Sequence, residues 1–331
     1  EMTSSLVGSE MCIRDRSRIS TEEELFQVYL CESLKYNDII FEKDYRFEML
    51  KLCYFLLFLE GNSQYLNWLS IFLKERKLTR WDYYPYFLVS HYCSAMVNES
   101  GATCSFELQN DTYYAFHLIN TMVVDYKDYK SSEDFVGIRY KPIYNKKKME
   151  YVIMSLNFFI DKFFQSFLFD FAKVLSEHYE ITKIKGYSQL KKFVGEEFIE
   201  KHFFYNIMER SFSTYKLFSG EKLKSLLKDG EPDYYMRKGN KIFLFEFKDI
   251  LIDSKTKHSG DYARIEQELY EQFVLSTIDK SSGKLKKHKQ RKGVTQLLYT
   301  IENKLPRILA ELDKTDSING YIIYPLSLIH I

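Results

Sequence analysis

The chain has 331 residues and a formal net charge of +1, with 47 Lys and Arg against 46 Asp and Glu. This length allows two domains and a large core, and a hydrophobic content of 45% excludes an intrinsically disordered chain. The balanced charge excludes a uniformly basic protein, so any surface that binds nucleic acid would have to be local.

Both ends of the chain resemble translated sequencing-adapter sequence. Residues 1–17 contain Met11-Cys12-Ile13-Arg14-Asp15-Arg16, and residues 326–331 read Leu326-Ser327-Leu328-Ile329-His330-Ile331. We exclude both segments from the expected fold. We therefore expect the chain to be a fragment of a longer natural protein.

Residues 18–184 have the patterns of a mainly helical domain. Thr21-Glu22-Glu23-Glu24 predicts a capping box at the start of the first helix. A possible β-hairpin is indicated by residues 136–143 and 149–156, which flank a polar turn. No motif here reveals a role, so a sensor, a partner-binding module and a substrate clamp all stay open. Apolar residues at helical spacing predict further helices at 47–59, 64–76, 81–97 and 157–178.

Neither the cysteines nor the apolar stretches indicate a zinc site or a membrane segment. The five cysteines have no CxxC spacing, so we expect reduced, mostly buried thiols in a cytoplasmic protein. The apolar stretch 156–175 is interrupted by four polar residues, which predicts an amphipathic, core-facing helix and no membrane partner. The cysteines are Cys12, Cys31, Cys53, Cys93 and Cys104, and the interrupting residues are Asp161, Lys162, Gln165 and Asp170.

Residues 194–208 have the periodicity of a helix that carries carboxylates. Glu197 and Glu200 are three residues apart, so in an α-helix they share a face with Phe204 and Ile207. This face could point the carboxylates at a neighbouring site. Solvated surface glutamates are the alternative interpretation for both.

The next segment predicts a β-hairpin. Residues 234–236 and 242–247 are rich in strand-forming side chains. Between them, Gly239-Asn240 supplies the positive φ values that a tight hairpin turn needs. A two-residue or four-residue loop places Asp233 opposite Glu246, whereas a bulged three-residue loop shifts the pairing by one residue.

This hairpin would collect ionisable groups at one end. Asp233 and Glu246 would be like charges on facing positions, which destabilises a sheet. Lys248 shares a face with Glu246, because side chains alternate along a strand. Residues 242–245 and Phe247 are apolar on both faces, so the strand is expected to be central and covered. Charges at the end of such a strand are costly unless they are paired or bind a metal, and two carboxylates suit Mg²⁺ or Mn²⁺.

A basic segment follows, from Lys280 to Lys292, and contains no acidic residue. Ser281-Ser282-Gly283 predicts that it is a loop. Such a loop beside a metal site could neutralise backbone phosphates, although a solvated charge run is the alternative. The residues that we expect to contact nucleic acid are Lys286, Lys287, Lys289, Arg291 and Lys292.

The last elements are a helix at 293–301 and a strand at 318–324. Leu297, Leu298, Ile301 and Leu305 supply the apolar stripe of the helix. Its polar positions include Gln296 and Tyr299.

These residues resemble the PD-(D/E)xK nuclease superfamily, which has the restriction-endonuclease-like fold. Pro232-Asp233 matches the PD element, and Glu246-Phe247-Lys248 matches the (D/E)xK element. The resemblance covers residues 185–325 and implies a core of a helix, three strands, a helix and a further strand (αβββαβ). The whole chain would therefore be an α+β or α/β protein, with a mainly helical region before the nuclease-like domain.

The resemblance also implies the site. Mg²⁺, or Mn²⁺ in its place, would be held by Asp233, Glu246, the backbone carbonyl of Phe247 and a glutamate of the first helix, with Glu200 chosen before Glu197. Lys248 would position or activate the attacking water. Gln296 matches the glutamine of a Q-and-Y element found in some members. The spacing to Tyr299 is one residue shorter than that form, so Tyr299 is left out of the site.

The function implied by the resemblance is that of a metal-dependent nuclease acting on DNA. One alternative is a non-catalytic module that binds nucleic acid or protein on a nuclease-like fold. Another is a helical interaction protein in which the hairpin is only structural. The choice between DNA and RNA, the mode of cleavage and the oligomeric state do not follow from the sequence.

Overall fold

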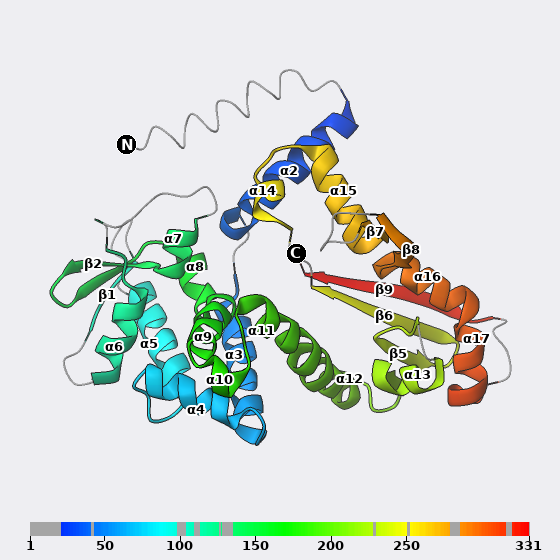
Figure 1. Ribbon diagram of the computed structural model, residues 1–331, viewed down its shortest axis with the longest axis horizontal. Coiled ribbons are helices and arrows are strands. Elements are labelled where there is room, and N and C mark those ends of the chain that lie inside the picture. Colours follow the sequence, from blue (N-terminus) through cyan, green and yellow to red (C-terminus); the bar gives the residue numbers. More distant parts are fainter. Residues whose placement is uncertain are drawn as a thin grey trace. The chain divides into compact units, whose positions relative to one another are not determined.

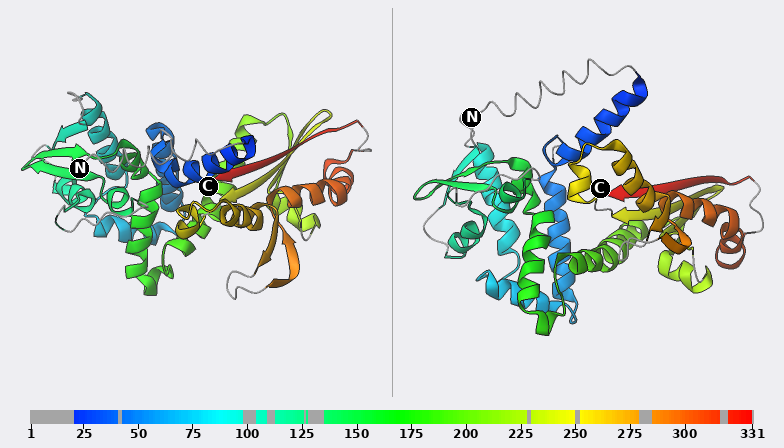
Figure 2. Two further views of the ribbon diagram at one scale, coloured as in Figure 1. Left: turned by 90° about the horizontal axis from the view of Figure 1, so that it is seen from above. Right: turned by 45° about the horizontal axis from the view of Figure 1, so that its top comes forward.

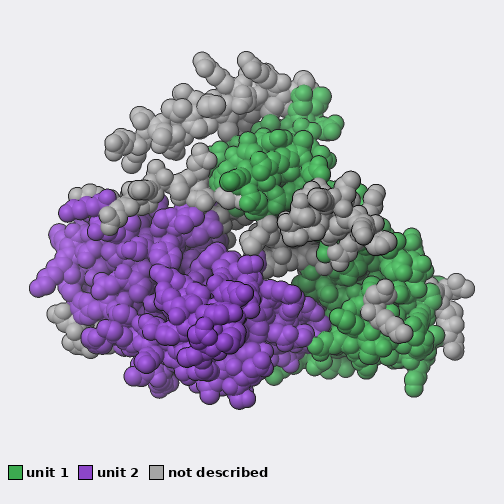
Figure 3. Space-filling view, in the orientation of Figure 1, with its two compact units in different colours: residues 1–37, 207–331 green, residues 38–206 purple. Residues whose placement is uncertain are grey.

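The protein has a mixed α+β fold, and its chain forms two compact units (Figure 3). Unit 2 is Asp38–Asn206, and unit 1 combines Glu1–Asn37 with Ile207–Ile331. The sequence instead placed the start of the second domain at residue 185. The structure, a computed structural model, describes residues 21–40, 43–97, 104–108, 113–125, 127, 135–227, 230–249, 252–278, 285–315 and 320–330.

Unit 2 is built from helices around an aromatic core. Phe55 has no exposed surface, and its ring makes edge-to-face contacts with four other phenylalanine rings, those of Phe164, Phe167, Phe171 and Phe198. The predicted helices at 47–59, 64–76 and 81–97 are confirmed. The helices are α3 (Tyr45–Gly61), α4 (Leu66–Glu75), α5 (Tyr83–Val97), α6 (Tyr113–Met122), α7 (Val136–Tyr140), α8 (Leu156–Asp161), α9 (Gln165–Glu177), α10 (Tyr179–Thr182), α11 (Tyr187–Phe193) and the π-helix η1 (Val194–Phe204).

A small antiparallel sheet completes unit 2, with strand order β1-β3-β2. Strands β2 (Ile143–Lys147) and β3 (Glu150–Ile153) form the second hairpin, but its turn lies at 148–149, later than the sequence indicated. Residues 136–140, expected in the first strand, form α7 instead. Strand β1 (Cys104–Glu107) pairs with β3 and was not predicted, because a four-residue strand has too little periodicity to be recognised.

Charged residues that the sequence placed on the polar face of a helix lie inside unit 2. Asp161, Lys162 and Asp170 are each at most 3% exposed, and the single helix predicted there is interrupted between α8 and α9. Lys43 donates to Asp161 across 2.5 Å, and Arg76 pairs with Asp170 at 3.3 Å. Burial lowers the pKa of Lys162 to about 8. Partners from distant segments allow these charges to be buried, and no local pattern reveals such partners.

Unit 1 is organised around a sheet of order β4-β5-β6-β9, which lies beneath α16 in Figure 1. Strand β5 is antiparallel to both β4 and β6, whereas β6 and β9 run parallel and lie side by side in both views of Figure 2. The strands are β4 (Lys216–Ser219), β5 (Tyr234–Lys238), β6 (Lys241–Asp249) and β9 (Ile322–His330). Two further strands, β7 (Leu275–Ile278) and β8 (Leu285–Arg291), form a separate pair.

The sheet of unit 1 is covered by helices on an apolar core. Tyr235, Ile242 and Leu244 of the sheet pack with Leu297 and Ile308, and all five are at most 2% exposed. The helices are α2 (Glu22–Ile40), α12 (Tyr205–Ser211), α13 (Gly220–Leu227), α14 (Ser254–Lys257), α15 (Tyr262–Phe273), α16 (Gly293–Asn303), α17 (Leu305–Arg307) and η2 (Ile308–Asp313). The capping box is confirmed at the start of α2, where Glu24 N–H donates to Thr21 Oγ1 at 3.1 Å.

Strand β9 differs from the strand that was predicted. It begins at Ile322 and continues to His330, and Lys241–Asp249 pairs with it throughout. The sequence had placed the strand at 318–324, of which 318–319 lie outside the described residues, and had excluded 326–331 from the fold. In the structure the backbone of 326–330 pairs with β6.

The cysteines and the helix lengths bear on two further expectations. Cys12 lies outside the described residues. Of the four described cysteines, Cys31 is buried, Cys53 and Cys104 are half-buried and Cys93 is exposed, so the expectation of mostly buried thiols is wrong. Among the helices of the described ranges, we find none with both the length and the apolar character needed to span a bilayer.

Candidate active site

The hairpin of β5 and β6 has the register that the sequence predicted. Lys238 pairs with Lys241 around the two-residue turn, and Tyr234 pairs with Phe245 at the far end. Gly239 has φ +57°, whereas Asn240 is not among the positive-φ residues of the described chain. A positive φ at the first turn position alone corresponds to a type II′ turn, so only the glycine supplies the unusual conformation.

Asp233 immediately precedes β5 and is held by backbone groups on both sides. Its Oδ2 accepts a hydrogen bond from Phe247 N–H at 2.6 Å, and its carbonyl accepts one from Gly220 N–H at 2.8 Å. The register of the hairpin, continued by one residue, places Asp233 opposite Glu246. The hydrogen bond from Phe247 N–H therefore fixes the carboxylate beside β6.

Glu246 is the buried carboxylate of the site. It lies in β6, between β5 and β9, and none of its surface is exposed. Gln296 donates from Nε2 to its Oε2 at 3.1 Å. A buried carboxylate is costly unless other groups offset its charge. The Gln296 amide is neutral, so most of the charge of Glu246 must be compensated by other groups.

Helix α16 brings Gln296 to the strand through contacts with the segment before Asp233. Gln296 Nε2 also donates to the carbonyl of Glu231 at 3.1 Å, and Thr300 Oγ1 donates to the carbonyl of Gly230 at 2.8 Å. Gln296 and Thr300 are four residues apart, so they face the same way from the helix. Thr300 is fully buried and was missed by the sequence analysis. Its i,i+4 spacing from Gln296 on a buried helix face was the available signal.

The first residue of α16 must be a glycine for this docking. Gly293 has φ +40°, and a Cβ atom added to it would lie 2.8 Å from the carbonyl oxygen of Phe273. Thr295 follows at the N-terminal turn, where its Oγ1 accepts from the N–H of Lys292 at 3.2 Å. These contacts fix the start of α16 against the end of α15, one turn before Gln296.

The basic segment after the hairpin is a strand over part of its length, not a loop throughout. Residues 285–291 form β8, which pairs with β7. Residues 280–284 lie outside the described residues, as do the side chains of Lys286, Lys287 and Lys289. Lys292 is the N-cap residue of α16 and is partly buried.

Arg291, at the end of β8, is exposed and lies over an aromatic ring. Its guanidinium carbon is 4.2 Å from the ring centroid of Tyr299. Lys304 Nζ lies 5.7 Å from the same centroid. Gly230 is also close to the ring, since a Cβ added there would be 3.2 Å from Tyr299 Cε1. Tyr299, which the sequence left out of the site, therefore joins the basic strand to the segment that leads to Asp233.

Glu197 and Glu200 lie in η1 and belong to unit 2. Lys201 Nζ donates to Glu197 at 2.8 Å, and Tyr205 Oη donates to Glu200 at 2.8 Å. These partners are four and five residues away. Because the hydrogen bonds of a π-helix run from residue i to i+5, residues three apart in η1 do not share a face as they do in an α-helix. The expectation that Glu197 and Glu200 share one face assumed α-helical geometry. Glu197 and Glu200 themselves lie in unit 2, whereas Asp233, Glu246 and Gln296 lie in unit 1.

The donors present fit a hard divalent cation. Mg²⁺ sites commonly use one or two protein carboxylates, with water and substrate phosphate as the other ligands, and Asp233 and Glu246 supply two at one end of the hairpin. Over the ranges that the structure describes, no group of three or more His, Cys, Asp or Glu side chains could hold a metal ion. The side chain of Lys248, the third residue of the motif, lies outside the described residues.

A separate cluster around Asp313 holds the other end of the hairpin. Asp313 of η2 is fully buried and accepts hydrogen bonds from the guanidinium of Arg237 and from the hydroxyl of Tyr235, the latter at 2.6 Å. Lys216 lies 2.7 Å away. Burial raises the pKa of Asp313, but the hydrogen bonds from Arg237, Lys216 and Tyr235 outweigh burial and lower it to about 2. Sequence analysis missed this cluster, because Asp313 is 76 residues from Arg237.

Comparison of the chain with protein-family models, with curated proteins and with solved structures found no match. The contacts around Asp233, Glu246 and Gln296 are therefore the basis on which a function can be inferred.

Proposed function

We propose that this protein is a metal-dependent nuclease that hydrolyses phosphodiester bonds in DNA. The observation that carries the proposal is the fully buried carboxylate of Glu246, which accepts from Gln296 while Asp233 is held at the facing position of the hairpin. A fully buried carboxylate in a central strand, with a second, half-buried carboxylate facing it, is unfavourable for stability alone. A catalytic metal site accounts for it.

The order of elements in unit 1 supports the same proposal. Helix α12 precedes β4, β5 and β6, and α16 and the parallel strand β9 come later in the chain. With α13, α14, α15, β7, β8, α17 and η2 taken as insertions, this order is compatible with the αβββαβ core that the motif implies. We therefore propose that unit 1 carries that core, with its site at the junction of Asp233, β6 and α16.

In this proposal Asp233, Glu246 and the carbonyl of Phe247 hold Mg²⁺, which would polarise the scissile phosphate and lower the pKa of a bound water. Asp233 is oriented for this task by its hydrogen bond from Phe247 N–H. Gln296 keeps Glu246 in one orientation through its amide. Lys248 would position the attacking water and offset developing negative charge.

The basic strand supplies the contact to nucleic acid. Arg291 is exposed, and its guanidinium is supported by the ring of Tyr299, so it can offer its donors to a backbone phosphate. The same strand, β8, also contains Lys286, Lys287 and Lys289. Duplex DNA contacts from this strand would weaken steeply with added salt, because each neutralised phosphate releases counterions.

Cleavage of plasmid DNA by the purified chain in Mg²⁺ tests the proposal. We expect nicking or linearisation by the wild type, and loss of activity in Asp233→Ala and Lys248→Ala. Glu311→Gln is the matched control, since Glu311 is an exposed carboxylate of unit 1 that pairs with Arg307. An inactive wild type that still binds DNA would favour a non-catalytic module. If the carboxylate variants cleave DNA and bind Mn²⁺ as the wild type does, the hairpin has only a structural role.

A further inference from the structure

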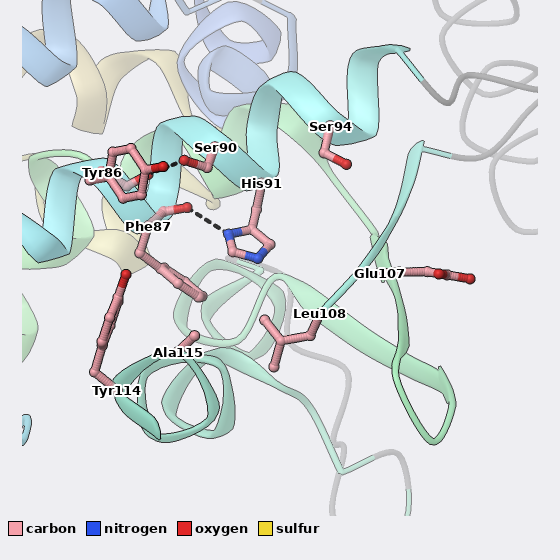
Figure 4. A pocket seen from close by; sticks show the side chains of 9 residues that line it. All are labelled: Tyr86, Phe87, Ser90, His91, Ser94, Glu107, Leu108, Tyr114 and Ala115. Atoms are coloured by element: carbon pink, nitrogen blue, oxygen red, sulfur yellow. Dashed lines mark hydrogen bonds between the residues drawn. The ribbon is translucent and has the colours of Figure 1, made fainter. Parts of the chain in front are cut away.

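A cavity in unit 2, well separated in sequence from the proposed nuclease motif, has the character of a ligand site. It has a volume of about 310 Å³, and α5, the segment that ends β1, and α6 enclose it (Figure 4). This volume is at the lower end of the range of small-molecule sites. The residues that line it are Tyr86, Phe87, Ser90, His91, Ser94, Glu107, Leu108, Tyr114 and Ala115.

The walls of the cavity combine aromatic rings with polar side chains, which include Ser90, Ser94 and Glu107. Phe87 and Tyr114 contribute rings, Ala115 lies beside Tyr114 on α6, and Leu108 comes from the segment after β1 (Figure 4). Tyr114 is held in place by stacking on Tyr83, with ring centroids 5.0 Å apart. Rings in the wall favour a planar guest, and the polar side chains beside them favour one that carries hydrogen-bonding groups.

His91 gives the cavity one polar group of defined character. Its Nδ1 lies 2.7 Å from the carbonyl oxygen of Phe87. A carbonyl only accepts, so Nδ1 must carry the proton and Nε2 must present a lone pair. Burial lowers the pKa of His91, which keeps the ring neutral at pH 7.

The ring of His91 is also fixed in orientation. It packs against Phe87 at 4.4 Å between centroids and edge-on against Phe106 at 4.7 Å. Figure 4 shows it projecting from α5 into the space above Leu108 and Ala115. The acceptor Nε2 is therefore preorganised, and a guest that donates to it loses little entropy on binding.

The charge of the lining sets a further limit on the guest. Among the described residues that line the cavity there is no Lys or Arg, and Glu107 is the one with a formal charge. An anionic guest would thus lose its hydration without gaining a cation. A guest with an N–H donor and no negative charge is therefore the most compatible with this lining.

We propose that this cavity binds a small, planar heteroaromatic molecule that donates an N–H to His91 Nε2 and carries no phosphate. The site gives unit 2 a ligand of its own, independent of the proposed nuclease activity. Its chemistry is that of a free nitrogen heterocycle, such as a nucleobase or an indole.

Two matched pairs of probes test the proposal on the wild-type chain by calorimetry or ligand-observed NMR. Indole and 1-methylindole differ in the N–H donor, and adenine and AMP differ in the ribose phosphate. We expect indole to bind about tenfold more tightly than 1-methylindole, the effect of one buried hydrogen bond, and adenine to bind more tightly than AMP. Equal affinities within the indole pair, tighter binding of AMP, or no binding by any probe would overturn the proposal.

Variants locate the binding. His91→Phe keeps an aromatic ring and removes the acceptor, so we expect the preference for indole over 1-methylindole to disappear. Ala115→Leu fills the cavity, so we expect binding of every probe to be lost. His117→Ala is the control, because His117 lies on the same helix as Ala115 and contacts the carbonyl of Glu75 outside the cavity. Unchanged binding in both cavity variants would place the ligand elsewhere.

Discussion

Gln296 and Glu246, 50 residues apart in the chain, are joined by a hydrogen bond of 3.1 Å from the side-chain amide of a helix to the carboxylate of a fully buried strand residue. The same amide also reaches the carbonyl of Glu231, directly before the Pro232-Asp233 pair. One side chain of α16 therefore connects both halves of the hairpin motif. Its loss should disturb the site and the stability of unit 1 together.

Replacement of Gln296 by Leu should lower the free energy of unfolding by about 1–3 kcal/mol, because the buried Glu246 carboxylate and the Glu231 carbonyl lose a donor. Urea denaturation measures the change. Asn303→Ala on the exposed face of the same helix should change stability far less. A Gln296→Leu variant as stable as the wild type would mean that this hydrogen bond does not hold the helix to the strand.

Replacement of Glu246 by Gln should raise the melting temperature in the presence of EDTA. The amide keeps an oxygen that can accept from Gln296 and removes a charge buried opposite Asp233, so a gain of about 1 kcal/mol is expected. The same variant should lose Mn²⁺ binding in isothermal titration. Lower stability together with retained Mn²⁺ binding would contradict the metal site.

The Asp313 cluster should make unit 1 sensitive to acid. The pKa of Asp313 is about 2 in the folded protein and about 3.9 in an unfolded chain. A lowered carboxyl pKa stabilises the folded state above the unfolded value, and this stabilisation of about 2–3 kcal/mol is lost as the pH falls from about 4 to 2. In Asp313→Asn the corresponding part of the pH dependence should be absent, which acid denaturation at several pH values would reveal. If Asp313→Asn loses stability over the same pH range as the wild type, other groups cause the acid sensitivity.

Replacement of Gly293 by Ala should destabilise the protein by more than about 1 kcal/mol. The residue has φ +40°, and the new methyl group would meet the Phe273 carbonyl at 2.8 Å. Gly195→Ala is the matched control, since a Cβ there meets nothing within 4 Å and the residue is helical. That control should be neutral or stabilising by about 0.5–1 kcal/mol. Thermal unfolding of both variants compares them, and equal effects would show that the start of α16 is not constrained by close packing.

Local patterns predicted the hairpin well because its determinants are local. Gly239 determines the position of the turn, and the alternation of side chains determines the two faces of β6. Together they fix the register of the hairpin, which starts at the pair of Lys238 and Lys241. The capping box at Thr21 was predictable for the same reason. The helix at Glu197 and Glu200 was predicted as helical, but its π geometry depends on packing that the periodicity of the sequence does not report.

The sequence by itself determined the hairpin and its register, since the turn and the strand periodicity lie within twenty residues of Asp233. Only the tertiary structure decided that Gln296 and Thr300 dock against Glu246 and Gly230, and that Asp313 neutralises Arg237. The physical reason is the range of the interactions. Backbone conformation and side-chain alternation are fixed by near neighbours, whereas the burial of a charge is decided by partners that folding brings from distant segments.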